Sequence, residues 1–246
     1  GCSFEALLTR RREELTGEEQ ERLAQVIAQR LSGRPLQYIM GEWDFMGLSF
    51  AVREGVLIPR ADTETLCETA LKLAAARGYA SCLDLCTGSG CLAVAIAALG
   101  NLAVTASDIS PAALRIAAQN AERNNVSRLV SIFGSDMFEQ IDGKFDMIVS
   151  NPPYIPTTDI PTLMREVREH EPIAALDGGE DGLDFYRIIA REGPSHLEKG
   201  GALLVEVGAG QAGDVAELFS AAGLRCIEIT RDLSGIERVV KAELAV

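Results

Sequence analysis

Residues 81–108 read SCLDLCTGSGCLAVAIAALGNLAVTASD, and they carry the strongest indication of the fold in this sequence. A short apolar run ends near Asp84, a glycine-containing turn follows at 86–90, an apolar helical pattern comes next, and a second strand pattern ends at Asp108. Strand, turn, helix and strand in this order are typical of parallel strands joined by a helical crossover. The stretch therefore predicts an α/β fold.

The alternation of strands and helices continues toward the C-terminus. It comprises a helix pattern at 111–124, strand patterns at 129–136, 145–150 and 201–207, and a helix from about Gln211. Two strand-like runs after Gly223 indicate an antiparallel pair at the C-terminal edge. In an open sheet of this kind ligands bind at the carboxyl ends of the strands, so the glycines and acidic residues there are the candidate site.

The N-terminal third predicts smaller elements. A capping-box pattern at 16–19 with apolar residues at helical spacing up to Leu31 predicts one amphipathic helix, preceded by another over roughly 4–15. The run WDFMGLSFAV at 43–52 predicts a hairpin around Gly47, and Asp62 is expected to cap a helix that ends near Gly78. We divide the chain into a helical segment at 1–33, a β-hairpin linker at 34–61 and the α/β domain at 62–246.

Composition limits the possible partners. The 246 residues include 23 Lys and Arg against 36 Asp and Glu, a net charge of −13, so the basic footprint that duplex nucleic acid requires is not expected. The sequence has no apolar run long enough to span a membrane and no secretory leader pattern, which indicates a soluble, cytoplasmic protein. Six cysteines without a CxxC pair and two histidines give no visible set of metal ligands, and we expect a monomer.

The turn after the first strand is a candidate cofactor site. It consists of Cys86, Thr87, Gly88, Ser89 and Gly90. Glycines let the backbone approach a ligand, and the following helix N-terminus offers free amide donors. By itself this pattern is equally consistent with an ordinary tight turn.

Two later positions strengthen the cofactor interpretation. Asp108, 24 residues after Asp84, is placed to accept hydrogen bonds from a ribose diol, which favours an adenosine ligand without separating a dinucleotide from S-adenosylmethionine. Asp136 and Met137 end the third strand, where they are suited either to meet an adenine ring or to begin the next turn.

The tetrapeptide Asn151-Pro152-Pro153-Tyr154, at the end of the fourth strand, is the most informative motif. Two prolines restrict the backbone, so the Asn151 side chain and the Pro152 carbonyl become fixed acceptors for the two hydrogens of an NH₂ group. Tyr154 is suited to stack on the flat group that carries this nitrogen. Because an amide or exocyclic amine is a poor nucleophile, holding both hydrogens would aim its lone pair at an electrophilic methyl group.

These features resemble Rossmann-like, S-adenosylmethionine-dependent amino-group methyltransferases. Three further segments, RPLQYI at 34–39, LIPRADTE at 57–64 and EHEP at 169–172 leading to LDGGEDGL at 176–183, narrow the similarity to the HemK/PrmC protein-glutamine methyltransferases. The resemblance implies a seven-stranded α/β fold. It also implies methyl transfer to the side-chain amide N5 of the glutamine in the Gly-Gly-Gln loop of class 1 peptide chain release factors.

The resemblance also implies residue roles. Residues 86–90 and Asp108 would hold S-adenosylmethionine, Met137 would pack near its adenine, and residues 151–154 would bind the substrate glutamine while Asn151 also borders the cofactor. Cys86 stands where the family commonly has a first glycine, and Ala61 where it commonly has a proline. The family's N-terminal bundle has roughly five helices, so the short helical segment here is expected to be truncated.

Two alternatives stay open. An adenine-N6 nucleic-acid methyltransferase makes the same chemical demand on Asn151 and Pro152, but it also requires a basic groove and a target-reading domain. A non-catalytic binding module would keep the fold while losing Asn151 or the glycines, and the sequence retains them. The roles of Arg60, Glu64 and Asp136 are not decided by sequence.

Overall fold

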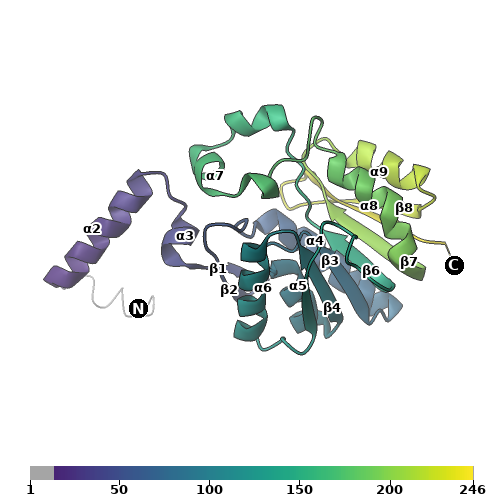
Figure 1. Cartoon of the computed structure of the whole chain (residues 1–246), viewed down its shortest axis with the longest axis horizontal. Helices are drawn as coiled ribbons and strands as arrows, with labels where there is room; N and C mark the ends of the chain where they lie inside the picture. The colour runs from purple at the N-terminus through teal and green to yellow at the C-terminus, as the bar shows by residue number, and fades with distance from the viewer. Residues whose placement is uncertain (1–13, 246) are drawn as a thin grey trace.

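A computed structural model of the chain describes residues 14–245. Its main body is a seven-stranded sheet in the order β5-β4-β3-β6-β7-β9-β8 (Figure 1). The strands are β3 Ser81–Leu85, β4 Ala103–Asp108, β5 Val130–Gly134, β6 Phe145–Ser150, β7 Leu197–Glu206, β8 Arg225–Arg231 and β9 Glu237–Glu243. β3 to β7 pair in parallel, whereas β9 pairs antiparallel with both β7 and β8. The predicted α/β fold and its antiparallel C-terminal pair are confirmed.

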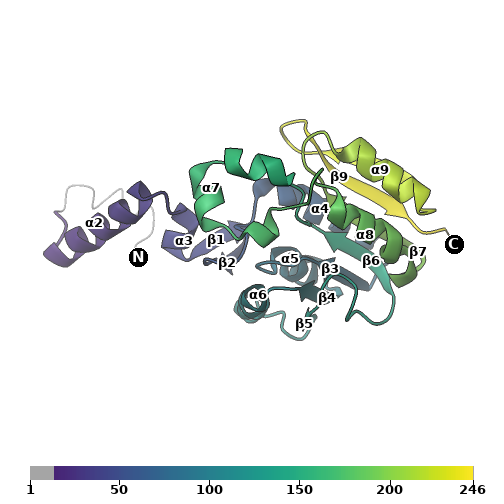
Figure 2. The same ribbon diagram turned by 45° about the horizontal axis from the view of Figure 1, so that its top comes forward.

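Helices cover both faces of this sheet (Figure 2). One layer contains α4 Ala61–Arg77, α5 Cys91–Gly100 and α6 Pro111–Arg123, and the other contains α8 Asp184–Glu192 and α9 Ala212–Ala221. Successive strand residues serve opposite layers: Cys82 packs in the cluster beneath α4 and α5, and Leu83 packs in the cluster beneath α8 and α9. Because both faces are buried, the strands read as nearly continuous apolar runs.

The remaining elements lie before the sheet or between its strands. They are α2 Gly17–Leu31, α3 Leu36–Met40, the hairpin strands β1 Glu42–Phe45 and β2 Leu48–Ala51, the insertion η1 Thr157–Thr162, α7 Arg165–His170 and η2 Ile173–Ala175, and the short η3 Gly193–His196. α2 projects from the body as an arm in both ribbon views and has no buried residue. Its C-terminal end meets the insertion, where Arg30 pairs with Glu166 at 2.6 Å.

The N-terminal predictions had mixed outcomes. The capping box at Thr16 and Glu19 and the hairpin at 42–51 are confirmed, while the helix predicted over roughly 4–15 falls almost entirely outside the described residues. The prediction that Asp62 caps α4 is wrong. Arg60 occupies the N-cap without a side-chain cap bond, and Asp62 lies in the first helical turn, where its carboxylate pairs with Arg238 at 3.3 Å.

Candidate active site

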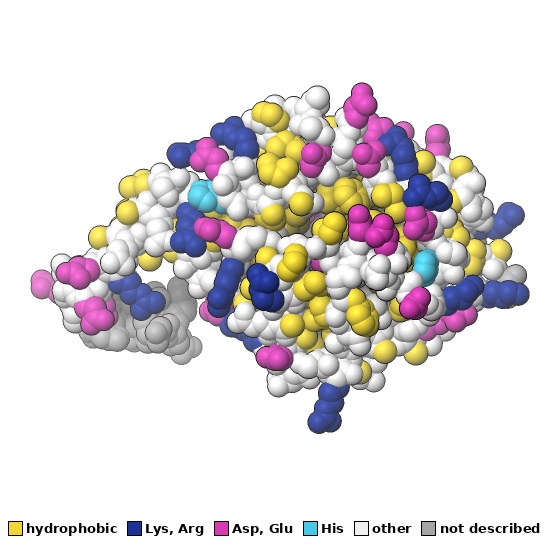
Figure 3. Space-filling model, in the orientation of Figure 1, with side chains coloured by type: hydrophobic (Ala, Val, Ile, Leu, Met, Phe, Trp, Pro, Cys, Tyr) yellow, Lys and Arg dark blue, Asp and Glu magenta, His cyan; other side chains and the backbone are white. Residues whose placement is uncertain are grey.

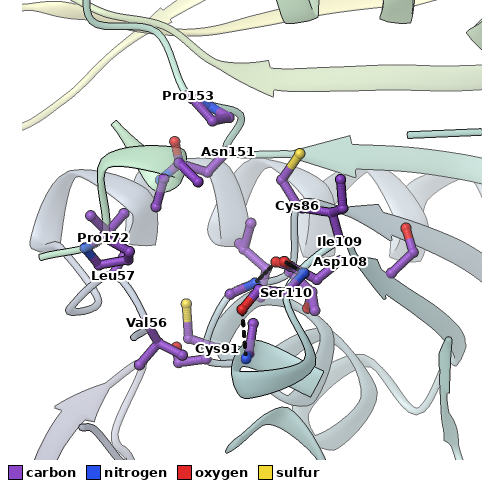
Figure 4. A pocket seen from close by; sticks show the side chains of 18 of the residues that line it. Val56, Leu57, Cys86, Cys91, Asp108, Ile109, Ser110, Asn151, Pro153 and Pro172 are labelled. Atoms are coloured by element: carbon purple, nitrogen blue, oxygen red, sulfur yellow. Dashed lines mark hydrogen bonds between the residues drawn. The ribbon is translucent and has the colours of Figure 1, made fainter. Parts of the chain in front are cut away.

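A pocket opens at the carboxyl ends of β3 and β6, two neighbouring parallel strands. Strand order reverses at this point, with β4 on one side and β7 on the other, so the loops that follow β3 and β6 diverge and leave a crevice. Residues of the loops after β3, β4, β5 and β6 line it, together with 55–63 and 172–175. Figure 4 shows Asn151 and Asp108 on different sides of this pocket, with Leu57 and Pro172 along a third side.

The loop after β3 has the backbone conformation that glycine favours at several positions. Cys86, Gly88 and Gly90 all have positive φ angles, of 58°, 56° and 79°. Cys86 therefore accepts the strain that a glycine there would avoid. Its Sγ lies 3.7 Å from Sδ of Met137, another pocket residue with positive φ, and burial raises the pKa of its thiol.

The glycines of this loop serve different purposes. The Gly88 amide lines the pocket and donates to Asp108, so it holds the loop against β4. A Cβ on Gly90 would lie 2.9 Å from Cβ of Ala117 in α6, which is too close for any real contact. Gly90 is therefore required by helix packing, and it is not among the residues that line the pocket. The Thr87 hydroxyl donates to Oδ2 of the buried Asp84 at 2.6 Å.

Asp108 ends β4 at the rim of the pocket. Its Oδ2 accepts from the Gly88 amide and its Oδ1 from the Ser110 amide, each at 2.8 Å. Burial raises the pKa of Asp108, and these backbone donors oppose the rise. Each carboxylate oxygen keeps a further lone pair, so the group is suited to accept from a diol in the pocket.

Asn151 comes from the loop after β6, opposite that rim. Its Nδ2 donates to Oγ1 of Thr63 at 3.1 Å, and none of the residues that the structure describes donates to its Oδ1. Asn151 and Pro153 line the pocket, whereas Pro152 and Tyr154 do not. The Tyr154 hydroxyl instead donates toward Oε1 of Glu206 at 3.4 Å, and burial, then the Glu206 charge, raises the pKa of that phenol.

The sequence analysis missed two residues next to Asn151. Thr63 and Glu206 are only 2% and 1% exposed. Burial raises the pKa of Glu206 to about 7, against the opposing effects of the Thr63 hydroxyl and the Arg238 charge. Glu206 could have been predicted as a site residue, because it is an acidic residue at the end of a parallel strand. Nothing in the sequence indicates Thr63 as a site residue except its place in the segment LIPRADTE.

One carboxylate joins the two parts of the pocket lining that lie outside the strand-end loops, namely residues 55–63 and the segment that begins at 172. Glu171, at the end of α7, accepts from the backbone N–H of Ile58 at 3.1 Å and from the Arg60 guanidinium. It is 5% exposed. Glu64, by contrast, accepts from the Met46 amide in the β1–β2 turn and so joins the hairpin to α4. Arg60 therefore helps to close the pocket, whereas Glu64 has a structural contact away from it.

Comparison with known proteins places this site in a family. Two family models match: "PrmC N-terminal domain" over residues 1–41 and "Methyltransferase small domain" over residues 63–168. The release factor glutamine methyltransferase of Geobacter sulfurreducens is 49% identical over 87% of this chain and 75% of its own length. That of Clostridium acetobutylicum is 40% identical over 96% of this chain and 84% of its own length.

The chain belongs to the release factor glutamine methyltransferase family. The resemblance seen in the sequence is thus confirmed. Solved structures with the same fold include a methyltransferase from Pyrococcus furiosus, with TM-score 0.62, 17% identity, and coverage of 94% of this chain and 100% of the other. The hMettl16 catalytic domain in complex with an RNA hairpin has TM-score 0.63 and 17% identity, covering 81% of this chain and 76% of the other. At these identities the likeness concerns the fold alone.

S-adenosylmethionine is the methyl donor of this family, and the pocket fits it. The lining includes the groups that this cofactor would need: Asp108 has carboxylate oxygens with free lone pairs, Gly88 has an open backbone, and Met137 and Cys86 form a polarizable apolar surface. Among solved proteins of the same fold, one from Salinibacter ruber contains S-adenosyl-L-homocysteine, the demethylated product. The agreement between donor set and ligand chemistry supports the cofactor assignment.

Proposed function

We propose that this chain transfers a methyl group from S-adenosylmethionine to the side-chain amide N5 of the glutamine in the Gly-Gly-Gln loop of class 1 release factors. The observation that carries the proposal is the Asn151 amide, which lines the pocket across from Asp108 and has its nitrogen bonded to Thr63. Its oxygen thereby stays available as an acceptor for an amide N–H of the substrate.

The residues of this chain would act by binding and orienting. S-adenosylmethionine supplies, when bound, an electrophilic methyl group on a sulfonium. Asn151 Oδ1 would accept one hydrogen of the glutamine NH₂. The Pro152 carbonyl would accept the other, although Pro152 itself is not among the residues that line the pocket, and together they would hold the nitrogen lone pair toward that methyl group. Such preorganised acceptors strengthen as positive charge develops on the nitrogen, and they need no general base for the attack itself. The amide proton leaves afterwards to solvent.

The same proposal covers the rest of the chain. We assign residues 86–89, Asp108 and Met137 to the cofactor and residues 151–154 to the substrate glutamine, while Gly90, also predicted to bind the cofactor, packs the loop against α6. Residues 1–33, 34–61 and 62–246 are assigned as helical segment, linker and catalytic domain. Tyr154 would contact the substrate after reorienting from Glu206. We further propose that the chain acts as a monomer in the cytoplasm, where translation terminates.

An adenine-N6 nucleic-acid methyltransferase is the second candidate, but charge disfavours it. The net charge is −13. On the face seen in Figure 3, basic side chains are interspersed with acidic ones, and apolar side chains gather near the middle. Nucleic-acid binding depends mainly on clustered cations that replace phosphate counterions.

Within the described residues, none of the helices has the length and apolar character of a membrane span.

The test is transfer of labelled methyl from S-adenosylmethionine to a purified class 1 release factor. Matched reactions contain the same factor with its loop glutamine replaced by alanine, single-stranded DNA, or duplex DNA. The proposal predicts label on the intact factor alone. Label on DNA would favour the adenine candidate, and equal labelling of the alanine variant would show that a different residue is methylated.

A further inference from the structure

A buried asparagine lies between the β1–β2 hairpin and the loop after β3. Asn120 belongs to α6 and is 0% exposed. This helix packs against both β2 and α5 (Figure 1). Asn120 Nδ2 donates to the Ala51 carbonyl at 3.1 Å and to the Ser89 carbonyl at 2.8 Å, and its Oδ1 accepts from the Ala51 N–H at 2.7 Å. One side chain thus binds the backbone of two segments that are far apart in the sequence.

These three hydrogen bonds fix the orientation of the Asn120 amide. Both Nδ2 hydrogens are donated and Oδ1 accepts, so with the amide turned by 180° the oxygen would face two carbonyl oxygens and the nitrogen would face an N–H group. Toward Ala51 the amide pairs with both backbone groups, as a neighbouring strand would. Toward Ser89 it donates alone, and no other residue within 14–245 donates to that carbonyl. The buried Ser89 carbonyl therefore depends on Asn120 for its partner.

The loop that Asn120 contacts is held from two sides. β4 holds the first half, because the Thr87 N–H donates to the Ser107 carbonyl at 2.9 Å and the Gly88 N–H donates to Asp108. Since residues 86, 88 and 90 all have left-handed φ angles, the shape of the loop requires such external bonds.

α6 holds the second half. Gly90 lies against Ala117, and Asn120, three residues later on the same face of this helix, binds the Ser89 carbonyl. Ser89 lines the pocket and Asn120 does not. The bond between them therefore carries the position of α6 to the pocket wall.

We propose that Asn120 is a positioning residue for the cofactor. Its bond to the Ser89 carbonyl holds the second half of the loop in the shape that lines the pocket, and its bonds to Ala51 join that loop to the hairpin. This inference rests on the proposed function, because it takes residues 86–89 as part of the cofactor site. Asn120 acts through Ser89, so its loss should weaken cofactor binding without removing a group that touches the cofactor.

Three substitutions test the proposal. Asn120→Ala removes all three hydrogen bonds. Asn124→Ala is the matched control, because the Asn124 Nδ2 donates to the Ser49 carbonyl of the same hairpin and to the Asn120 carbonyl, and not to the loop after β3. Val215→Ala controls for lost stability, because Val215 is buried in α9 on the other face of the sheet and its truncation destabilises the fold without touching the loop or the hairpin.

The measurement is calorimetric titration with S-adenosylhomocysteine, at a temperature at which all four proteins are folded. In Asn120→Ala the Kd should rise about tenfold or more, because the buried Ser89 carbonyl loses its partner in the loop shape that binds. Asn124→Ala and Val215→Ala should stay within about threefold of the original Kd. An unchanged Kd in Asn120→Ala would overturn the proposal. An equal loss in either control would overturn it too, since attachment of the hairpin or general stability would then be the cause.

A second readout uses the unsubstituted chain, so it does not depend on how well Asn120→Ala folds. In isotopically labelled protein, S-adenosylhomocysteine should slow the exchange of the Asn120 Nδ2 protons with water about threefold or more, because a loop held by the ligand opens less often. The Nδ2 protons of Asn124 should exchange at the same rate with and without the ligand. An equal response of the two amides, or none in Asn120, would overturn the proposal.

Neither measurement needs a release factor, so a failure of methyl transfer would leave both results standing. If the unsubstituted chain bound no S-adenosylhomocysteine, the cofactor assignment would be wrong and the role of Asn120 would be refuted with it. Binding of S-adenosylhomocysteine without any effect at Asn120 would refute the role of Asn120 alone.

Discussion

At the residue scale, Asn151 is the group on which the proposed chemistry depends most. Asn151→Ala removes the amide oxygen that would accept from the substrate nitrogen, so methyl transfer should fall at least about 100-fold. Binding of S-adenosylhomocysteine should change little, because the residues proposed to contact its ribose and adenine follow or end β4 and β5. Titration calorimetry and single-turnover transfer measure the two effects separately. Transfer at the original rate would remove Asn151 from the mechanism.

Asp108 is the corresponding residue for the cofactor. Asp108→Ala removes acceptors for the ribose and releases the Gly88 and Ser110 amides, so the Kd for S-adenosylhomocysteine should rise about 10- to 100-fold. Asp108→Asn keeps one acceptor oxygen and should give an intermediate loss. Calorimetric titration of the three proteins provides the check. Equal affinity in all of them would exclude Asp108 as a ribose ligand.

At the scale of elements, the insertion between β6 and α8 closes the pocket through Glu171. Its carboxylate joins α7 to the segment before α4 by accepting from Ile58 and Arg60. Glu171→Ala would leave the buried Ile58 amide without its partner, at a cost of roughly 1–3 kcal/mol. We expect both a lower melting temperature and weaker cofactor affinity.

Glu169→Ala is the matched control for this prediction. Glu169 lies on the same short helix, but its carboxylate is exposed and, among the described residues, pairs with Arg165 and Arg168 alone. Exposed pairs of this kind contribute little to stability. If Glu171→Ala and Glu169→Ala behaved alike in thermal unfolding and calorimetry, the joining role of Glu171 would be refuted.

At the scale of the whole molecule, burial of two carboxyls makes stability depend on pH. Burial raises the pKa of Asp84 and of Glu206 to about 7 each, whereas both groups titrate near 4 in an unfolded chain. The folded chain therefore binds more protons between about pH 4 and 7. Their stabilising contribution is complete below this window and is lost as the pH rises through 7.

The free energy of unfolding should accordingly fall by at least about 1 kcal/mol between pH 5 and pH 8. Denaturant titrations at several pH values measure this slope. Glu206→Gln should reduce it, and Glu198→Gln, an exposed substitution on the same strand, should leave it unchanged. A slope insensitive to Glu206→Gln would show that Glu206 titrates normally.

The sequence alone predicts the order of the strands and the family, whereas α3, α7 and α8 are not among the elements that it predicts. Strand and helix patterns are local, since they follow from residue spacing and from glycine and proline, and so β3 to β9 could be predicted. The position of the loop after β3, of Asp108 and of Asn151 at one pocket could be predicted as well, because each follows or ends a parallel strand, and parallel strands bring their carboxyl ends to one edge. The prediction that Asp62 caps α4 was wrong because an acidic residue at the N-cap and one in the first helical turn give the same local sequence pattern.

Which side chains contact one another depends on the tertiary structure. Thr63 and Asn151 are 88 positions apart in the chain, and they form a hydrogen bond because α4 packs across the sheet beside β6 and β7. The same holds for Gly90, whose need for glycine comes from Ala117 on α6, and for Glu171 with Ile58. Hydrogen-bond partners depend on distance and burial in three dimensions, and no spacing along one sequence encodes these quantities.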